Sequence, residues 1–174
     1  MDVELSQRDG RTLIRGRFFR IVPRQRAGLA IHGSRPDAAG RFHAPGQPAL
    51  YMSPTAEWAA IGLSTHAMRD GDSRVVVPLD VTWAEVIDLR NGADCRAAGV
   101  SPKDADAPWR DRGLEGEKPK PWTLADRVRF IGCDGLIDPS KLKKGAWHLV
   151  LFEWNQPNRP EVRPAGVAVP LSAE

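Results

Sequence analysis

Cysteine is scarce in this sequence of 174 residues, and its two copies lie in unrelated surroundings. Cys95 and Cys133 belong to no closely spaced pair, so the sequence offers neither a zinc-binding motif nor a disulfide framework. The four histidines likewise lack the spacing of metal ligands among themselves. We therefore expect a protein that is kept reduced, as in the cytoplasm, and that holds no metal ion.

Long apolar runs are also absent. None approaches the roughly 20 residues needed to cross a bilayer, and the first ten residues, MDVELSQRDG, contain no signal-peptide core. We therefore expect a cytoplasmic protein without a membrane partner. The sequence further lacks a Gly-x-Ser-x-Gly elbow, a phosphate-binding loop and a dinucleotide-binding glycine signature. These absences argue against α/β-hydrolases, P-loop nucleoside triphosphatases and Rossmann-type dehydrogenases.

A strong excess of one charge is missing as well. The chain has 25 Lys and Arg against 22 Asp and Glu, which gives a net charge of +3. Because the basic residues are interleaved with acidic ones, we do not expect nucleic acid to bind directly. The length and the hydrophobic content of 41% fit a single domain over residues 1–174. We expect its core over about 11–155 and a Pro-rich tail of weak structure over 156–174, apart from Gly166–Leu171.

Structural signals are densest between Gly40 and Ser64, in the run GRFHAPGQPALYMSPTAEWAAIGLS. A turn-prone loop comes first, and the apolar run Ala49–Met52 that follows is typical of a buried strand. A helix is then expected to start, with Ser53 or Thr55 as its N-cap.

A loop, a strand and a helix in so few residues can form the wall of a pocket. In such a wall Arg41 can face an anion, and the ring of Tyr51 can face another flat ring.

The rest of the chain alternates strand and helix signals. Residues 24–39 are polar and glycine-rich and are expected to form a loop, and residues 104–121 a charged surface connection. Strands are expected at Thr12–Val22, at Val75–Val81 with both faces buried, and at Trp83–Leu89, Gly135–Asp138 and Trp147–Trp154. Helices or helical turns are expected at Asn91–Gly99, from Ser101 onward and at Trp122–Ile131.

These segments together resemble the RES-domain toxins. In that family a Gly-Arg-aromatic-Asn loop leads to a Leu-Tyr-Leu-type strand and then a helix, and GRFHAPGQPALYMSPTAEWA resembles this signature, with His43 at the Asn position. Further blocks fit in the same order over roughly residues 11–155, namely Arg17-Phe18-Phe19-Arg20, Val86–Leu89, Pro121–Ala125, Gly135–Ser140 and Leu149–Phe152.

The resemblance implies an α+β fold like that of ADP-ribosyltransferases, with small bent antiparallel sheets around an NAD cleft and flanking helices. It implies that the protein consumes NAD, its substrate, by degrading it or by transferring its ADP-ribose. It also implies a cognate Xre-like antitoxin as partner. The assembly expected is either a homo-oligomer of the toxin or a toxin–antitoxin hetero-oligomer.

The resemblance further implies which residues form the site. Arg20 would hold the dinucleotide from the first strand, and Arg41 would bind the pyrophosphate with it. Tyr51 would stack on the nicotinamide or brace the ribose, while His43 and Ser140 would line the nucleotide cleft. Arg20, Tyr51 and Ser140 are the expected catalytic residues. Residue by residue, Arg20 can also be read as a surface arginine and Ser140 as a turn cap.

One departure from the family pattern matters for the chemistry, because a Glu usually stands on the helix where this sequence has Gly62. Another carboxylate could serve instead, with Asp138 and Glu57 as candidates, although Glu57 lies about 140° around the helix from Gly62. Alternatively, the protein is a divergent, catalytically weak module that binds a nucleotide or its antitoxin, or it carries a substitution that tames a toxin. If Gly62 marks a missing carboxylate, Gly62→Glu should raise NAD turnover.

Overall fold

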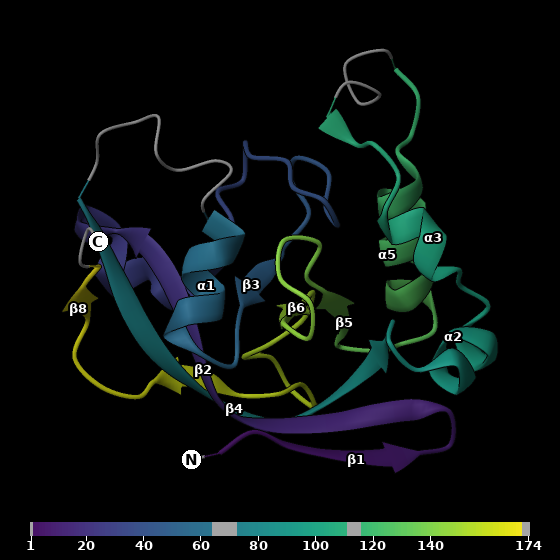
Figure 1. Cartoon of the computed structure of the whole chain (residues 1–174), viewed down its shortest axis with the longest axis horizontal. Coiled ribbons are helices and arrows are strands. Elements are labelled where there is room, and N and C mark those ends of the chain that lie inside the picture. Colours follow the sequence, from purple (N-terminus) through teal and green to yellow (C-terminus); the bar gives the residue numbers. More distant parts are fainter. Residues whose placement is uncertain (1, 64–72, 111–115, 172–174) are drawn as a thin grey trace.

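The computed structural model of the chain describes residues 2–63, 73–110 and 116–171 (Figure 1). Its strands belong to one sheet of eight, hydrogen-bonded in the order β1-β2-β4-β5-β6-β3, with β7 and β8 both paired to β4. The strands are β1 (Glu4–Arg8), β2 (Arg11–Pro23), β3 (Leu50–Met52), β4 (Arg74–Asp88), β5 (Gly135–Pro139), β6 (Trp147–Leu151), β7 (Val162–Pro164) and β8 (Val169–Pro170). All neighbours are antiparallel except β4 and β5.

The long antiparallel pair of β2 and β4 forms the base of the molecule (Figure 1). Buried and half-buried residues alternate along the first eight residues of each strand, as the two-residue period of a strand requires. The expectation of two separate strands around Trp83 was wrong, because β4 runs without a break through 15 residues. The expectation that Val75–Val81 is buried on both faces was also wrong, since every second side chain there is only half-buried.

The sheet curls so that its last strand, β3, is also connected to β2. Phe19 of β2 and Ser53, just after β3, exchange two backbone hydrogen bonds of 2.7 and 2.9 Å. This bridge links the sheet's outer strand β3 to β2, so that β2, β4, β5, β6 and β3 form a ring of neighbours. The ring encloses a large apolar cluster that includes Phe18, Leu79 and Leu149.

The α-helices that the structure describes are α1 (Ala56–Leu63), α2 (Gly92–Ala98), α3 (Pro102–Ala105) and α5 (Lys120–Phe130). Figure 1 shows α2, α3 and α5 grouped at one end of the sheet and α1 across from them. The expected cap of α1 is confirmed for Thr55, whose hydroxyl accepts the Trp58 backbone N–H (3.1 Å). In α5, Leu124 and Val128 are buried as the helical spacing predicts, against a second apolar cluster containing Leu136 and Phe152. No helix among the described residues is long and apolar enough to cross a membrane.

Three segments differ from the sequence-based expectation. Residues Arg24–His32 form a 3₁₀ helix, η1, where a loop was expected. The N-terminal strand β1 was not foreseen, because its five residues are all exposed and carry no apolar alternation. The C-terminal tail adds two strands, and only β8 lies in the expected piece Gly166–Leu171. Pairing with β4 orders β7, whose Val162 is buried, although nothing in its local sequence signals a strand.

Candidate functional site

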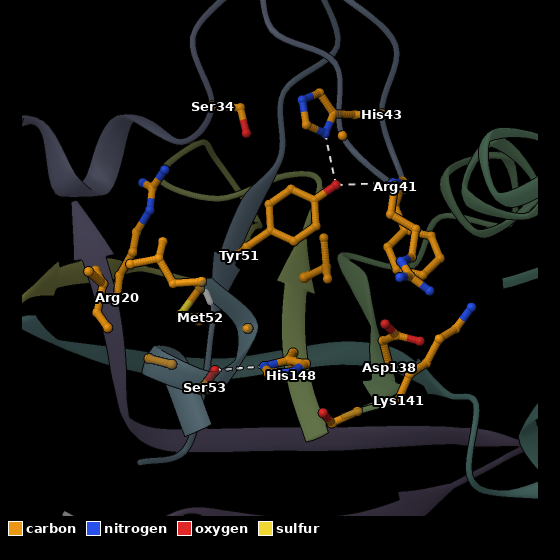
Figure 2. Close-up of a pocket in the computed structure, with 18 of the residues that line it drawn as sticks. Arg20, Ser34, Arg41, His43, Tyr51, Met52, Ser53, Asp138, Lys141 and His148 are labelled. Carbon is orange, nitrogen blue, oxygen red and sulfur yellow. Dashed lines mark hydrogen bonds between the residues drawn. The ribbon is translucent and has the colours of Figure 1, made fainter. Parts of the chain in front are cut away.

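A pocket of about 410 Å³ opens where the ends of β2, β3, β5 and β6 meet the loop 33–46 and helix α1. This volume is within the range of small-molecule sites. Figure 2 shows Tyr51 in the middle, Arg20 and Ser34 on one side, and Arg41, Asp138 and Lys141 on the other. All five residues predicted for the site line this pocket: Arg20, Arg41, His43, Tyr51 and Ser140.

The loop that carries Arg41 is held in place by two side chains of helix α5. Trp122 Nε1 donates a hydrogen bond to the Gly40 carbonyl oxygen (2.8 Å), and Arg129 Nη2 donates to the Phe42 carbonyl oxygen (3.1 Å). Gly40 has no room for a side chain, because a Cβ there would lie 2.4 Å from His43 Cε1 and 2.8 Å from the Tyr51 hydroxyl. The glycine thus lets the loop close tightly onto the Tyr51 strand.

The Tyr51 hydroxyl holds this loop from the other side. It accepts the Phe42 backbone N–H (3.0 Å) and is hydrogen-bonded to His43 Nδ1 (2.8 Å). Burial raises the pKa of the Tyr51 phenol, so the group stays protonated. Burial also lowers the pKa of the His43 imidazole to about 4, with a smaller contribution from Arg129, so His43 is neutral at pH 7. The hydroxyl is therefore occupied within the protein, and the Tyr51 ring is the part that faces the pocket.

The two predicted arginines differ in how free their guanidinium groups are. Arg20 donates from its two terminal nitrogens to the carbonyl oxygens of Ala30 and Gly33, and burial lowers its pKa to about 10. Within the described part of the chain, Arg41 makes one hydrogen bond, from Nη1 to the Ala105 carbonyl oxygen at the end of α3 (3.2 Å). Arg41 therefore has more donors left for a ligand, whereas Arg20 also positions the loop that follows η1.

Asp138, near the end of β5, is a buried carboxyl group in the wall of the pocket. The residue is 8% exposed, and its Oδ1 has no hydrogen-bond partner among the described residues. Burial raises its pKa from 3.8 to about 7, although the positive charges of Arg41 and Lys141 oppose the rise.

A serine and a histidine close the bottom of the pocket. Ser53 Oγ and His148 Nδ1 are hydrogen-bonded at 2.8 Å (Figure 2). Burial, and secondly the charge of Arg41, lowers the pKa of His148, which therefore favours its neutral form. Sequence reasoning missed His148 and treated Ser53 only as a candidate cap. Alternation along β6 could have placed His148 on the same face as Val150, which also lines the pocket.

The remaining predicted positions fall into two groups. Ser140 lies at the pocket and its Oγ also accepts the Leu142 backbone N–H (3.3 Å), so it caps a turn as well. Gly62 lines the pocket, and a Cβ there would lie 3.2 Å from His148 Cε1. Glu57 does not line the pocket, since it is exposed and pairs with Lys143.

Comparisons with known proteins agree with this architecture. A family model described as the RES domain matches residues 17–173, a range that includes the C-terminal strands. A chain from the crystal structure of the M. tuberculosis MbcT–MbcA toxin–antitoxin complex superposes with a TM-score of 0.58 at 17% sequence identity. The match covers 91% of this chain and 85% of that one, and it confirms the expected α+β fold. No curated protein matches the sequence.

Proposed function

Because the chain belongs to the family of proteins with a RES domain, we propose that it is an NAD-consuming toxin whose pocket cleaves the bond between nicotinamide and ribose. One observation carries this proposal. Residues from β2, β3, the loop 40–46 and the end of β5, which are far apart in the sequence, converge on one pocket in the pattern expected for such a site.

The layout of the pocket fits an extended dinucleotide. Arg20 and Arg41 lie on opposite sides of the Tyr51 ring (Figure 2). A ligand that contacts both guanidinium groups has to pass over this ring. NAD has the required parts, namely a pyrophosphate for the arginines and a flat nicotinamide for the aromatic face.

The reaction needs few groups from the protein. Loss of nicotinamide leaves positive charge on the ribose, so the site has to orient the sugar and stabilise a cation-like transition state. Tyr51 is held rigidly by Phe42 and His43, and this order fixes the ring against which the substrate is positioned. Ser140 follows Asp138 by two residues and also lines the pocket, so its hydroxyl can hydrogen-bond a ribose hydroxyl.

We further propose that a cognate antitoxin of the Xre-like type holds the toxin inactive. The structural neighbour in the MbcT–MbcA complex was crystallised as a toxin–antitoxin pair, which supports a partner of this kind. Copurification with the product of a neighbouring gene, followed by sizing of the complex, tests this part of the proposal.

The competing function is a binding module that keeps the pocket but has lost turnover. Gly62 favours it, because no carboxylate reaches the pocket from α1. NAD loss and nicotinamide release should be followed with purified protein, with and without added inorganic phosphate. Release of free ADP-ribose would identify water as acceptor, and a phosphate-dependent rate would identify phosphate. NAD binding by calorimetry without any loss of NAD would favour the binding module.

A further inference from the structure

Asp138 is the single acidic residue that lines the pocket in the part of the chain that the structure describes. Its carboxylate is buried in the folded protein, and one of its oxygens has no hydrogen-bond partner there. A buried carboxylate that lacks a partner is costly to maintain. Carboxylates of this kind are concentrated in the pockets of functional sites.

The surroundings of Asp138 keep the charge available without neutralising it. Arg41 and Lys141 lie near enough to act on the pKa of Asp138, yet each is tied to the end of α3. Arg41 donates to the Ala105 carbonyl oxygen, and Lys141 Nζ contacts the Asp106 carbonyl oxygen (3.0 Å) and carboxylate (3.1 Å). The two cations are thereby held beside the carboxylate rather than paired with it.

Asp138 also lies next to the same residue, His148, that a side chain at position 62 of α1 would contact. Asp138 and His148 are direct partners in the antiparallel register of β5 and β6, so their side chains share one face at close range. A Cβ on Gly62 would meet the same His148 ring at 3.2 Å. The carboxylate on β5 and the empty position on α1 therefore flank one histidine, and the pocket has its negative charge on the sheet instead of on the helix.

We propose that Asp138 is the carboxylate that faces the ribose while the nicotinamide bond breaks, an assignment that rests on the proposed function of this pocket. In this step the bond between ribose C1′ and the nicotinamide nitrogen breaks, and its electron pair leaves with neutral nicotinamide. C1′ gains a bond to the oxygen of the acceptor, water in the simplest case, which releases its proton. Ionised Asp138 stabilises the positive charge that develops on the ribose between these two events.

The rate should then follow the ionisation of Asp138. Turnover is expected to rise as the pH increases from about 6 to about 8, because the pKa of Asp138 is about 7. Nearby titratable groups come from every element around the carboxylate: Arg41, Lys141, Asp106, Tyr51 and His148. Tyr51 has a raised pKa and His148 a lowered one, so neither is expected to ionise in this range.

The test compares steady-state NAD consumption, as kcat and KM, across pH 5.5 to 8.5 for three proteins. Asp138→Asn should lose turnover by roughly 10²–10³-fold, the usual effect of removing one group that stabilises a transition-state charge. It should also lose the rise with pH, while its NAD affinity by calorimetry changes less than kcat. Glu57→Gln is the matched control, because it removes the other candidate carboxylate, which pairs with Lys143 outside the pocket, and it should behave like the natural protein.

Each outcome decides something. If the natural protein consumes NAD and Asp138→Asn matches its kcat and pH profile within about threefold, the role of Asp138 is wrong and the proposed function stands. If the natural protein does not consume NAD, whether or not it binds NAD, the proposed function itself is wrong, and the assignment of Asp138 is wrong with it. Asp138→Glu keeps the charge, so a variant that folds with Glu and regains part of the turnover supports the electrostatic role.

Discussion

Replacing Asp138 by Asn should stabilise the protein at pH 8, although we assign the carboxylate to catalysis. The pKa of Asp138 is raised by burial from 3.8 to about 7 in the folded protein. The folded state therefore holds the proton more tightly than the unfolded state does. The stability that this provides is present below about pH 4 and is lost as the pH rises through 7. Asn keeps the shape of the side chain and does not ionise.

The size of the effect follows from the two pKa values. At about 1.4 kcal/mol per pKa unit, ionising Asp138 in the folded protein costs roughly 4 kcal/mol more than in the unfolded chain once the pH is well above 7. Between pH 5 and pH 8 the stability of Asp138→Asn relative to the natural protein should rise by roughly 2–3 kcal/mol. In a chain of this length the difference in Tm should change by roughly 5–10 °C.

Thermal unfolding of both proteins at a series of pH values is the assay. The exposed Asp37 provides a control of opposite sign, since a hydrogen bond from Arg35 lowers its pKa. Asp37→Asn should bring no gain in stability at pH 8. If the Tm difference between Asp138→Asn and the natural protein is the same at pH 5 and pH 8, Asp138 ionises as an ordinary exposed carboxylate, and the argument from burial is refuted.

Three further predictions concern the ligand. Arg41→Ala and Arg20→Ala should each weaken NAD binding by about 1.5–3 kcal/mol, as expected for charge-assisted hydrogen bonds; unchanged affinity in both, measured by calorimetry, would remove the phosphate-binding role. Tyr51→Phe should keep most of the NAD affinity because the ring remains, at a cost of about 1–3 kcal/mol in folding stability from the unpaired Phe42 N–H and His43. Tyr51→Ala should lose binding, and equal losses of affinity in Phe and Ala would show that the hydroxyl is the working group. Gly62→Glu should raise NAD turnover, more in an Asp138→Asn background than in the natural one, because both positions face His148. The Glu side chain at position 62 requires the His148 ring to shift slightly. If turnover does not increase in either background, a carboxylate on α1 does not reach the substrate.

Local sequence predicted the elements whose formation depends on nearby residues. The alternation in Thr12–Val22 predicted most of β2, and the helical spacing of Leu124 and Val128 predicted α5. The Thr55 cap could be predicted because the capping hydroxyl and the backbone N–H from which it accepts a hydrogen bond are only three residues apart. The family resemblance selected residues that the structure brings to one pocket, although their roles remain predictions.

Only the tertiary structure showed how these elements are joined. The bridge between Phe19 and Ser53 and the pairing of β7 with β4 are contacts between distant segments, which no local pattern encodes. The tail therefore reads as weakly structured in isolation and is ordered by a strand that lies about 80 residues earlier in the sequence.

The same holds for the chemistry of the site. The residue type and position of Asp138 were visible in the sequence, and it was one of two candidate carboxylates. Its high pKa depends on burial among segments that meet only in the fold. The positions of Arg41 and Lys141 beside it also depend on the fold, because both are bound to residues at the end of α3. The sequence by itself determined which ionisable groups are available, whereas tertiary burial decided their protonation, because the cost of a charge depends on the solvent and dipoles around it.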